Sequence, residues 1–257
     1  MRLDGKKIII TGATGIARSA AGLFTGFGAD VYVISLVADE CVALAEEVDL
    51  AGWSVADLSD EQQAVSATAE ATAGLGQVDG IFAVAGGSGR RFGDGPLDQV
   101  SLDAWRATLD LNLTTSFLPV REALRVMLGQ GSGGSVVFVS SVLARYPVAG
   151  LFATHAYAAA KGAQVSLARS MAARYAGDGI RVNVVAPGLV RTPMSERAAN
   201  DPATAEFARS KQPLAGGFLE PEDVASAAAF LLSDAARGLT GQVIEVDGGW
   251  GVTETGG

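Results

Sequence analysis

The feature that most restricts the fold is an alternation of short apolar runs with glycine turns and alanine-rich stretches. The first run, residues 6–11, leads into the turn Gly12-Ala13-Thr14-Gly15-Ile16-Ala17, and an alanine-rich stretch continues to about residue 27. Further strand-like runs follow at 31–35, 52–56 and 78–85, with helical stretches between them. Strands that alternate with helices predict parallel pairing, because a parallel connection needs a crossover of helical length.

The second half of the chain continues this pattern. Strands are predicted at 135–140, 180–185 and 242–246, with a helix that carries Tyr157 and Lys161 to about residue 176. A long helix capped by Ser101 is predicted to hold Asn112 in its middle. Prolines within 193–217 favour a helical substrate flap there. We therefore predict a single α/β domain over 1–257, with a Rossmann-like, doubly wound, seven-stranded parallel sheet and helices on both faces.

Charge and rare residues exclude several classes of function. The formal net charge is −9 and basic residues form no concentrated run, which argues against binding to nucleic acid phosphates. With one cysteine, Cys41, and one histidine, His155, the chain lacks the residues for an internal disulfide or a Cys/His metal site. No apolar run is long enough to span a membrane, and no signal peptide is evident. We expect a cytoplasmic protein without metal or membrane contacts.

Tyr157 and Lys161 are the candidate reactive pair. They are one helical turn apart, so both side chains lie on one helix face. Free tyrosine titrates near ~10, which makes it a poor base at neutral pH. A nearby ammonium is expected to favour the phenolate and lower that pKa. Such a group can exchange a proton with an alcohol or carbonyl oxygen.

The strand, glycine turn and helix at residues 6–27 predict a dinucleotide site. Glycines let the backbone approach a diphosphate, and the helix N-terminus offers free N–H groups and partial positive charge. The second strand ends at Ser35 and Leu36, where neither an acid for a ribose hydroxyl nor an arginine for a 2′-phosphate stands. Asp39 and Glu40 follow closely and disfavour a phosphate, so NAD is favoured over NADP.

Taken together, the motifs resemble the short-chain dehydrogenase/reductase family over essentially the whole chain. The residues that carry the resemblance are Thr11-Gly12, Gly15-Ile16, Asp57-Leu58, Ala85-Gly86, Asn112, Ser141, Tyr157-x-x-x-Lys161, Pro187-Gly188-x-x-x-Thr192 and Val246-Asp247-Gly248-Gly249. The resemblance implies an NAD(P)-dependent enzyme that interconverts a small secondary alcohol, such as a sugar or cyclic alcohol, and its ketone by hydride transfer. It also implies a homotetramer, with a homodimer as the alternative.

The resemblance assigns four residues to catalysis. Tyr157 would exchange a proton with the substrate oxygen, and Ser141 would hydrogen-bond that oxygen. Lys161 would hold the nicotinamide ribose and favour the phenolate, and Asn112 would anchor a water that links Lys161 to solvent. The implied cofactor contacts are Gly12, Thr14, Gly15 and Ile16 at the diphosphate, Ser35 after the second strand, Asp57 and Leu58 at the adenine, Ala85 and Gly86 along the ribose with Tyr157 and Lys161, and Pro187, Gly188, Val190 and Thr192 at the nicotinamide.

Three departures from the family pattern stand out. The glycine turn is shorter than usual, since only Ala13 and Thr14 separate its first two glycines, and Ala17 replaces the third glycine. The family's Asn-Asn-Ala-Gly after the fourth strand reads Ala83-Val84-Ala85-Gly86. The interval from Ser141 to Tyr157 is longer than usual, with the extra residues in the 147–153 loop. This third departure is expected to reshape the substrate pocket and not the chemistry.

Two rival functions follow from the same residues. The first is a 3-oxoacyl-[acyl-carrier-protein] reductase, but the stretches 131–134 and 176–178 lack the basic residues that would dock an acidic carrier. The second is a non-catalytic binding protein on the same fold, suggested by the altered turn and the missing asparagines. The intact set of Asn112, Ser141, Tyr157 and Lys161 favours an enzyme. Arg90, Arg91 and Arg145 are candidates to meet an anionic group on the substrate.

Overall fold

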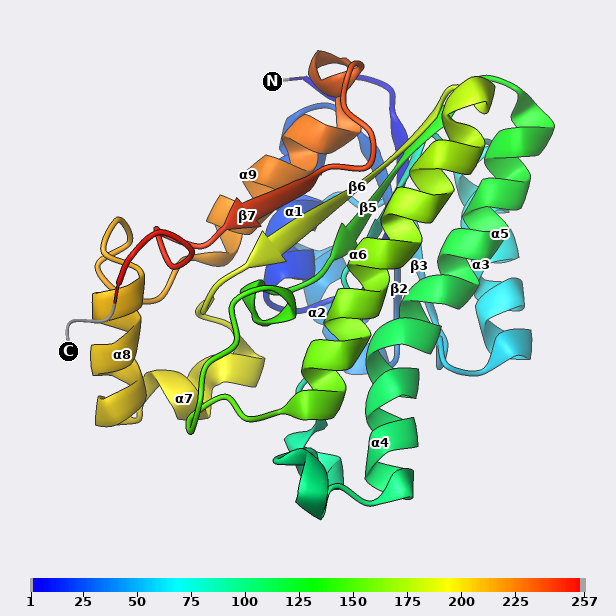
Figure 1. Cartoon of the computed structure of the whole chain (residues 1–257). Helices are drawn as coiled ribbons and strands as arrows, with labels where there is room; N and C mark the ends of the chain where they lie inside the picture. Colours follow the sequence, from blue (N-terminus) through cyan, green and yellow to red (C-terminus); the bar gives the residue numbers. More distant parts are fainter. Residues whose placement is uncertain (1, 255–257) are drawn as a thin grey trace.

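The computed structural model describes residues 2–254. Within them, one parallel sheet has the strand order β3-β2-β1-β4-β5-β6-β7 and carries helices on both faces (Figure 1). The strands are β1 Lys7–Thr11, β2 Asp30–Ser35, β3 Gly52–Val55, β4 Gly80–Ala83, β5 Gly134–Val139, β6 Ile180–Pro187 and β7 Val243–Val246. The helices are α1 Ile16–Gly26, α2 Ala38–Glu47, α3 Glu61–Leu75, α4 Leu102–Leu109, α5 Thr115–Gln130, α6 His155–Tyr175, α7 Glu196–Ala199, α8 Pro202–Lys211 and α9 Pro221–Leu232. The predicted fold class is confirmed.

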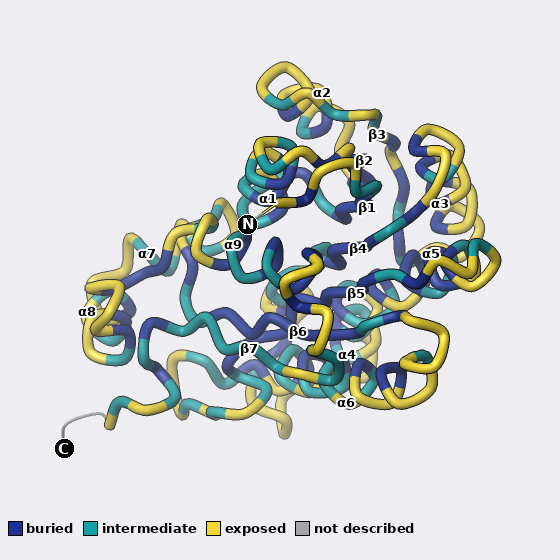
Figure 2. The backbone as a smooth tube through the Cα atoms, turned by 90° about the horizontal axis from the view of Figure 1, so that it is seen from above, coloured by how far each residue is buried: buried dark blue, intermediate teal, exposed yellow. Residues whose placement is uncertain are grey.

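Each strand sends alternate side chains to opposite faces of the sheet. Ile8 and Ile10 of β1 pack with α1, α2 and α9 on one face. Ile9 packs on the other face with residues of α3, α5 and α6. The five inner strands, β2, β1, β4, β5 and β6, are accordingly buried between two helical layers whose outer sides are exposed, and the edge strands β3 and β7 are less buried (Figure 2). The near-continuous apolar composition of the strands is therefore explained by burial of both faces.

Local signals placed most element ends correctly. Asp60 caps α3 through its side chain, and Gly76 ends that helix in the left-handed conformation. The fourth strand is shorter than the predicted 78–85, because the N–H groups of Val84 and Ala85 donate to Thr11 Oγ1 after the strand ends. The predicted single helix after Ser101 is also interrupted. A π-helical turn, Asp110–Thr114, separates α4 from α5.

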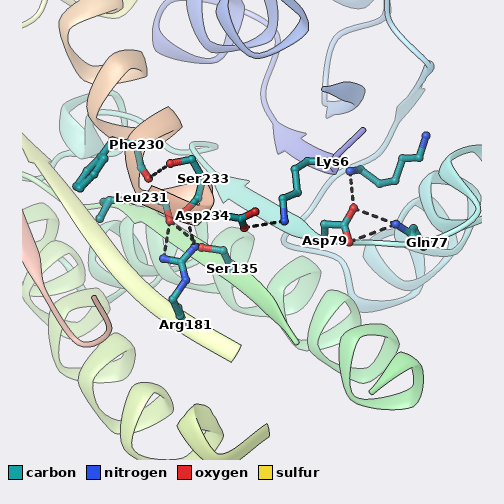
Figure 3. Close-up of polar contacts among 10 residues, drawn as sticks. Lys6, Gln77, Asp79, Ser135, Arg181, Phe230, Leu231, Ser233 and Asp234 are labelled. Carbon is teal, nitrogen blue, oxygen red and sulfur yellow. Dashed lines mark hydrogen bonds and ion pairs between the residues drawn. The ribbon is translucent and has the colours of Figure 1, made fainter. Parts of the chain in front are cut away.

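The amino-terminal edge of the sheet is closed by polar contacts around the end of α9 (Figure 3). Arg181 donates to the carbonyl oxygens of Leu231 at 2.7 Å and Ser233 at 3.2 Å, and Ser135 Oγ also donates to Leu231. Lys6 pairs with Asp234 at 2.9 Å. The last carbonyls of a helix lack partners within the helix, so these donors satisfy them. The polar groups at this edge are therefore bonded to one another within the chain. The opposite, carboxyl edge is the place to look for a ligand site.

Within residues 2–254, no helix combines the length and apolar character needed to cross a bilayer. The same part of the chain contains no group of three or more His, Cys, Asp or Glu side chains arranged to hold a metal ion.

Candidate active site

The predicted site residues meet at the carboxyl edge of the sheet. In open α/β sheets this edge is where ligands bind. A Cβ placed on Gly12 would lie 3.5 Å from the Ala17 Cβ and 4.0 Å from the Ala85 Cα, so the glycine turn and the end of β4 are in contact. A Cβ placed on Gly15 would lie 2.9 Å from the Thr192 Cγ2, which brings the start of α1 against the segment after β6.

Lys161 and Tyr157 share one face of α6. Lys161 is 4% exposed, and its Nζ donates to the Val139 carbonyl oxygen at 2.8 Å. Nζ also lies 5.6 Å from the centre of the Tyr157 ring. An ammonium carries three donors, and Val139 is its only hydrogen-bond partner among the described residues. Two donors therefore stay available for a ligand at the end of β5.

The structure separates the roles of two adjacent serines at the end of β5. Ser140 Oγ donates to the Lys161 carbonyl oxygen at 2.7 Å and is buried, so it ties β5 to α6. Ser141 Oγ accepts from the Leu143 N–H at 3.2 Å, and its side chain hydrogen-bonds Tyr157. Ser140 is therefore engaged with α6, and Ser141 is the serine in polar contact with Tyr157.

The expected direction of the Tyr157 pKa is wrong. Burial raises the pKa of Tyr157 above its ordinary value, and the hydrogen bond with Ser141 opposes this only in part. Burial also lowers the pKa of Lys161 to about 7. Desolvation disfavours the charged form of both groups, and it is the largest cause of each shift. A further positive charge at the site would be needed to favour the phenolate.

Asn112 lies in the π-helical turn, in contact with the segment after β4. Its Oδ1 accepts from the Gly87 N–H at 3.1 Å and its Nδ2 donates to the Gly87 carbonyl at 2.9 Å. A Cβ on Gly86 would lie 2.9 Å from Asn112 Oδ1 and 3.6 Å from Lys161 Nζ, so both polar groups flank Gly86. Single π-helical turns inside α-helices are frequent at functional sites.

Three observations fit a bound dinucleotide. The start of α1 has no acidic residue in its first turn, and its N-cap, Gly15, makes no side-chain hydrogen bond to it. The Ala17 and Arg18 N–H groups donate to the Thr14 carbonyl oxygen, but no carboxylate neutralises the positive end of the helix dipole, which suits an anion. Gly86 leaves no room for a side chain between Asn112 and Lys161. Lys161 has free donors beside it, which suits a ribose diol.

Gly15 offers a direct test of the short glycine turn. Its φ of 54° and ψ of −121° are unfavourable for a residue with a Cβ, and a Cβ would also press on Thr192. Gly15→Ala is expected to cost about 1–3 kcal/mol of unfolding free energy and to weaken dinucleotide binding. Thermal unfolding and NADH titration measure both effects. Gly177→Ala, at an open position with ordinary backbone, is the control, and equal behaviour of the two variants would contradict the expectation.

The remaining predicted cofactor residues lie along the same edge. Asp57 follows β3, and its Oδ1 accepts from the Ser59 N–H and hydroxyl at 2.9 and 2.6 Å. Leu58 and Ser35 are buried at the ends of β3 and β2. Gly188, directly after Pro187, is packed against Gln212, and a Cβ at Gly188 would clash with Gln212 Oε1. Thr14, Ile16 and Val190 also belong to segments at this edge of the sheet.

The predicted flap is helical and packs on two other segments of the site. Phe207 of α8 lies 5.5 Å from Phe152 and 5.2 Å from Trp250, measured between ring centres. Phe152 belongs to the long 147–153 loop, so the extra residues of that loop dock against the flap. Met194 reaches toward Gly87, since a Cβ there would lie 3.7 Å from the Met194 Sδ.

The three candidate arginines are engaged within the chain. Arg145 pairs with Glu245 at 3.1 Å, and Arg90 donates to the Leu151 carbonyl oxygen. Arg91 stacks over the Phe92 ring with 4.6 Å to its centre. Cation–π and hydrogen-bond contacts of this kind account for these charges without a substrate anion.

A family model described as enoyl-(acyl carrier protein) reductase matches residues 11–251. A solved short-chain type dehydrogenase/reductase from Mycobacterium ulcerans superposes with a TM-score of 0.91 at 31% identity, over 99% of this chain and 92% of that one. The chain belongs to the short-chain dehydrogenase/reductase family. The family assignment from the sequence motifs is thus confirmed, and with it an oxidoreductase.

Curated members of the short-chain dehydrogenase/reductase family match almost end to end. A 2,5-dichloro-2,5-cyclohexadiene-1,4-diol dehydrogenase from Sphingobium indicum is 38% identical over 96% of this chain and 98% of its own. A cis-4-hydroxycyclohexanecarboxylate dehydrogenase from Sinomonas cyclohexanicum is 38% identical over 94% and 95%. An inactive 2-(S)-hydroxypropyl-CoM dehydrogenase 2 from Xanthobacter autotrophicus is 41% identical over 80% and 87%.

Sequence reasoning missed three residues that support this short-chain dehydrogenase/reductase site. Gln164 on α6 donates to the Asn112 carbonyl oxygen at 2.9 Å and holds the π-helical turn. Gln212, fully buried, bonds both Leu189 and Gly217 and anchors the flap. Asp94 accepts two N–H bonds from the start of α6. Apart from Gly217, their partners are distant in the sequence, so no local pattern indicated them.

Proposed function

We propose that this protein is an NAD(P)-dependent oxidoreductase that interconverts a cyclic secondary alcohol and its ketone, with Tyr157 as the acid/base. The observation that carries the proposal is that the Tyr157 ring lies 5.6 Å from the Nζ of the buried Lys161, with Ser141 also in polar contact with Tyr157. A phenol with a hydroxyl and an ammonium nearby suits proton transfer to an oxygen.

The residues of the chain divide the work in this proposal. A bound nicotinamide dinucleotide would supply the hydride acceptor or donor. Ser141 Oγ orients the substrate oxygen toward the Tyr157 hydroxyl, which takes or gives the proton. Lys161 would hold the nicotinamide ribose with its remaining donors, and Asn112 keeps the segment at Gly87 in place. As in the sequence prediction, Asn112 is also proposed to anchor a water that leads to solvent.

The elevated pKa of Tyr157 has a consequence for this chemistry. Burial makes the neutral phenol the ground state of the chain alone. The oxidised nicotinamide ring carries a positive charge, which would favour the phenolate when it is bound. The neutral phenol suits the proton-donor role in ketone reduction, and the phenolate suits the base role in alcohol oxidation.

The relatives narrow the substrate class. Two of them are named for six-membered-ring alcohols, a cyclohexadiene diol and a hydroxycyclohexanecarboxylate. Phe152, Phe207 and Trp250 form an aromatic cluster that joins the 147–153 loop to the flap, and both of these segments were predicted to shape the substrate pocket. We therefore propose a cyclic secondary alcohol or diol. The engaged arginines favour a neutral ring over an anionic one.

The first experiment titrates the protein with NADH and NADPH while nicotinamide fluorescence is followed. NADH is expected to bind more tightly, because Ser35 and the exposed Leu36 offer no cation to a 2′-phosphate and Asp39 and Glu40 stand in the first turn of α2. Tighter NADPH binding would reverse the cofactor preference. Binding of neither would favour the non-catalytic alternative, for which the inactive relative is a precedent.

The same experiment continues with turnover of cyclic and open-chain secondary alcohols with the preferred cofactor. We expect cyclic alcohols to give the larger kcat/KM. A carrier-linked 3-oxoacyl substrate is the comparison, because the matching family model is described as an acyl-carrier-protein reductase. The stretches 131–134 and 176–178 carry no basic residue, and Arg174 beside them pairs with Asp178. Faster turnover of the carrier-linked substrate than of its free analogue would contradict this proposal.

We also propose a homotetramer of this chain. The helices α4 and α5 expose large apolar side chains, including Leu102, Phe117 and Leu128. Apolar side chains of this size along one helical layer favour contact with a second copy.

A further inference from the structure

A buried carboxylate, Asp94, lies at the start of the helix that carries Tyr157. Asp94 is 6% exposed and belongs to a segment, 87–97, that we call the strap. Its Oδ1 accepts from the Ala156 N–H at 2.9 Å and its Oδ2 accepts from the Tyr157 N–H at 2.9 Å. Among residues 2–254 it has no ion-pair partner. A carboxylate is therefore buried specifically against the backbone of the proposed acid/base residue.

The contact replaces a missing local cap. Thr154 is the N-cap of α6, but its side chain makes no hydrogen bond to the first turn. Buried N–H groups without a partner cost about 1–3 kcal/mol each, and the first turn of a helix has no internal partners for them. Asp94 satisfies two of these groups and places a negative charge at the positive end of the helix dipole.

Other contacts hold the strap in register with α6. The His155 N–H donates to the Gly95 carbonyl oxygen at 3.3 Å, and the Leu97 N–H donates to His155 Nδ1 at 3.0 Å. Gly89 is packed so closely that a Cβ would lie 2.3 Å from Thr108 Oγ1 and 2.8 Å from the Asp94 Cβ.

At its other end, the strap begins at Gly87, which is bonded twice to Asn112. The strap therefore connects the π-helical turn to the first turn of α6. Asp94 is its point of attachment to Tyr157.

We propose that Asp94 is a positioning residue that sets the place of the Tyr157 hydroxyl by capping α6 from the strap. This inference rests on the proposed function of Tyr157 as acid/base. Asp94 touches the Tyr157 backbone and not its hydroxyl, so its effect passes through the first turn of α6. A proton donor displaced by about 1 Å loses about 100-fold in rate. A small shift of the first turn of α6 is therefore expected to have a large effect on kcat.

The test compares Asp94→Asn and Asp94→Ala with Asp98→Asn, an exposed acid on the adjoining turn. We expect kcat to fall about 10- to 100-fold in both Asp94 variants, with NADH affinity within about twofold of wild type. Amide hydrogen exchange of the cofactor-free protein is expected to become faster in peptides that contain Ala156 and Tyr157. Asp98→Asn is expected to change none of the three measurements.

A second variant separates capping from general stability. Asp94→Ala with Thr154→Asp supplies a carboxylate from the N-cap position itself. We expect it to restore slow exchange at Ala156 and Tyr157 and most of the lost kcat. Restored exchange without restored kcat would overturn the proposal, as would a kcat unchanged in both Asp94 variants or an equal loss in Asp98→Asn.

A failure of the proposed function is distinguishable from a failure of this inference. If wild-type protein turns over no substrate, the proposed function fails, and the exchange data still decide whether Asp94 caps α6. If wild-type protein is active and exchange at Tyr157 does not respond to Asp94→Asn, only the capping role fails. If Asp94→Ala alone does not fold, wild type is compared with Asp94→Asn and with the double variant Asp94→Ala, Thr154→Asp.

Discussion

Tyr157→Phe is expected to lower kcat about 100- to 10,000-fold, the usual contribution of a positioned acid/base group. This corresponds to about 3–5 kcal/mol of transition-state stabilisation. The ring and its contact with Lys161 are kept, so only the proton and the hydrogen bond with Ser141 are lost. NADH affinity is therefore expected to stay within about twofold of wild type. Steady-state kinetics and fluorescence titration measure the two effects.

The matched control is Tyr175→Phe. Tyr175 is the last residue of the same helix, α6, and its ring lies 5.0 Å from the Arg174 guanidinium carbon, far from Ser141. We expect it to leave kcat and NADH affinity unchanged. Normal turnover by Tyr157→Phe would show that another group transfers the proton and would end the proposed mechanism.

Lys161→Met is expected to lower both kcat and cofactor affinity. Methionine fills similar space, but it removes the donors that face the site and the positive charge beside Tyr157. Loss of one preorganised donor costs about 100- to 1,000-fold in kcat, and the lost ribose contact is expected to raise the Kd for NADH as well. This joint effect distinguishes Lys161 from Tyr157. Steady-state kinetics with NADH titration measure it.

The control for the removed charge is Lys6→Met. Lys6 lies at the amino-terminal edge of the sheet and pairs there with Asp234 (Figure 3). We expect this variant to keep wild-type kcat and NADH affinity. Unchanged NADH affinity in Lys161→Met would contradict the proposed ribose contact.

The same variant tests the buried charge through stability. The pKa of Lys161 is lowered from 10.5 to about 7 in the folded chain. Between these values the unfolded chain holds a proton that the folded chain lacks, so the free energy of unfolding rises with pH, by up to about 1.4 kcal/mol per unit. Below pH 7 Lys161 is charged in both states, so the full cost of burying its ammonium lowers the free energy of unfolding. Denaturant unfolding at several pH values is expected to show this rise in wild type and its loss in Lys161→Met.

The sequence indicated the reactive pair because helical periodicity is local. Tyr157 and Lys161 are one turn apart, and any helix there places them on one face. The glycine turn at Gly12 and Gly15 and the strand ends were visible for the same reason, since each depends on a few adjacent residues. The parallel order of the strands followed from their alternation with helices.

The π-helical turn at Asn112 shows where local patterns end. The surrounding residues read as one regular helix, and nothing in their spacing marks a break. The turn is held instead by contacts with Gly87 and Gln164, which are 25 and 52 residues away. Contacts between distant segments of this kind exist only in the folded chain.

The pKa values of Tyr157 and Lys161 were also outside the reach of the sequence. Proximity alone predicts that an ammonium lowers the pKa of a phenol. The folded chain buries Lys161 and partly buries Tyr157, and desolvation shifts both pKa values against the charged forms. Burial depends on every element packed around the site, so only the tertiary structure sets its sign.

The sequence by itself thus determined the doubly wound sheet, the family and the residues that meet at its carboxyl edge, because apolar alternation, glycine turns and helical spacing are local properties. The tertiary structure alone decided how Asn112 is held, how the flap is anchored and how α6 is capped. Asp94 is the clearest case. Its partners, Ala156 and Tyr157, lie 62 and 63 residues along the chain, and a contact over that distance is chosen by packing of the whole fold.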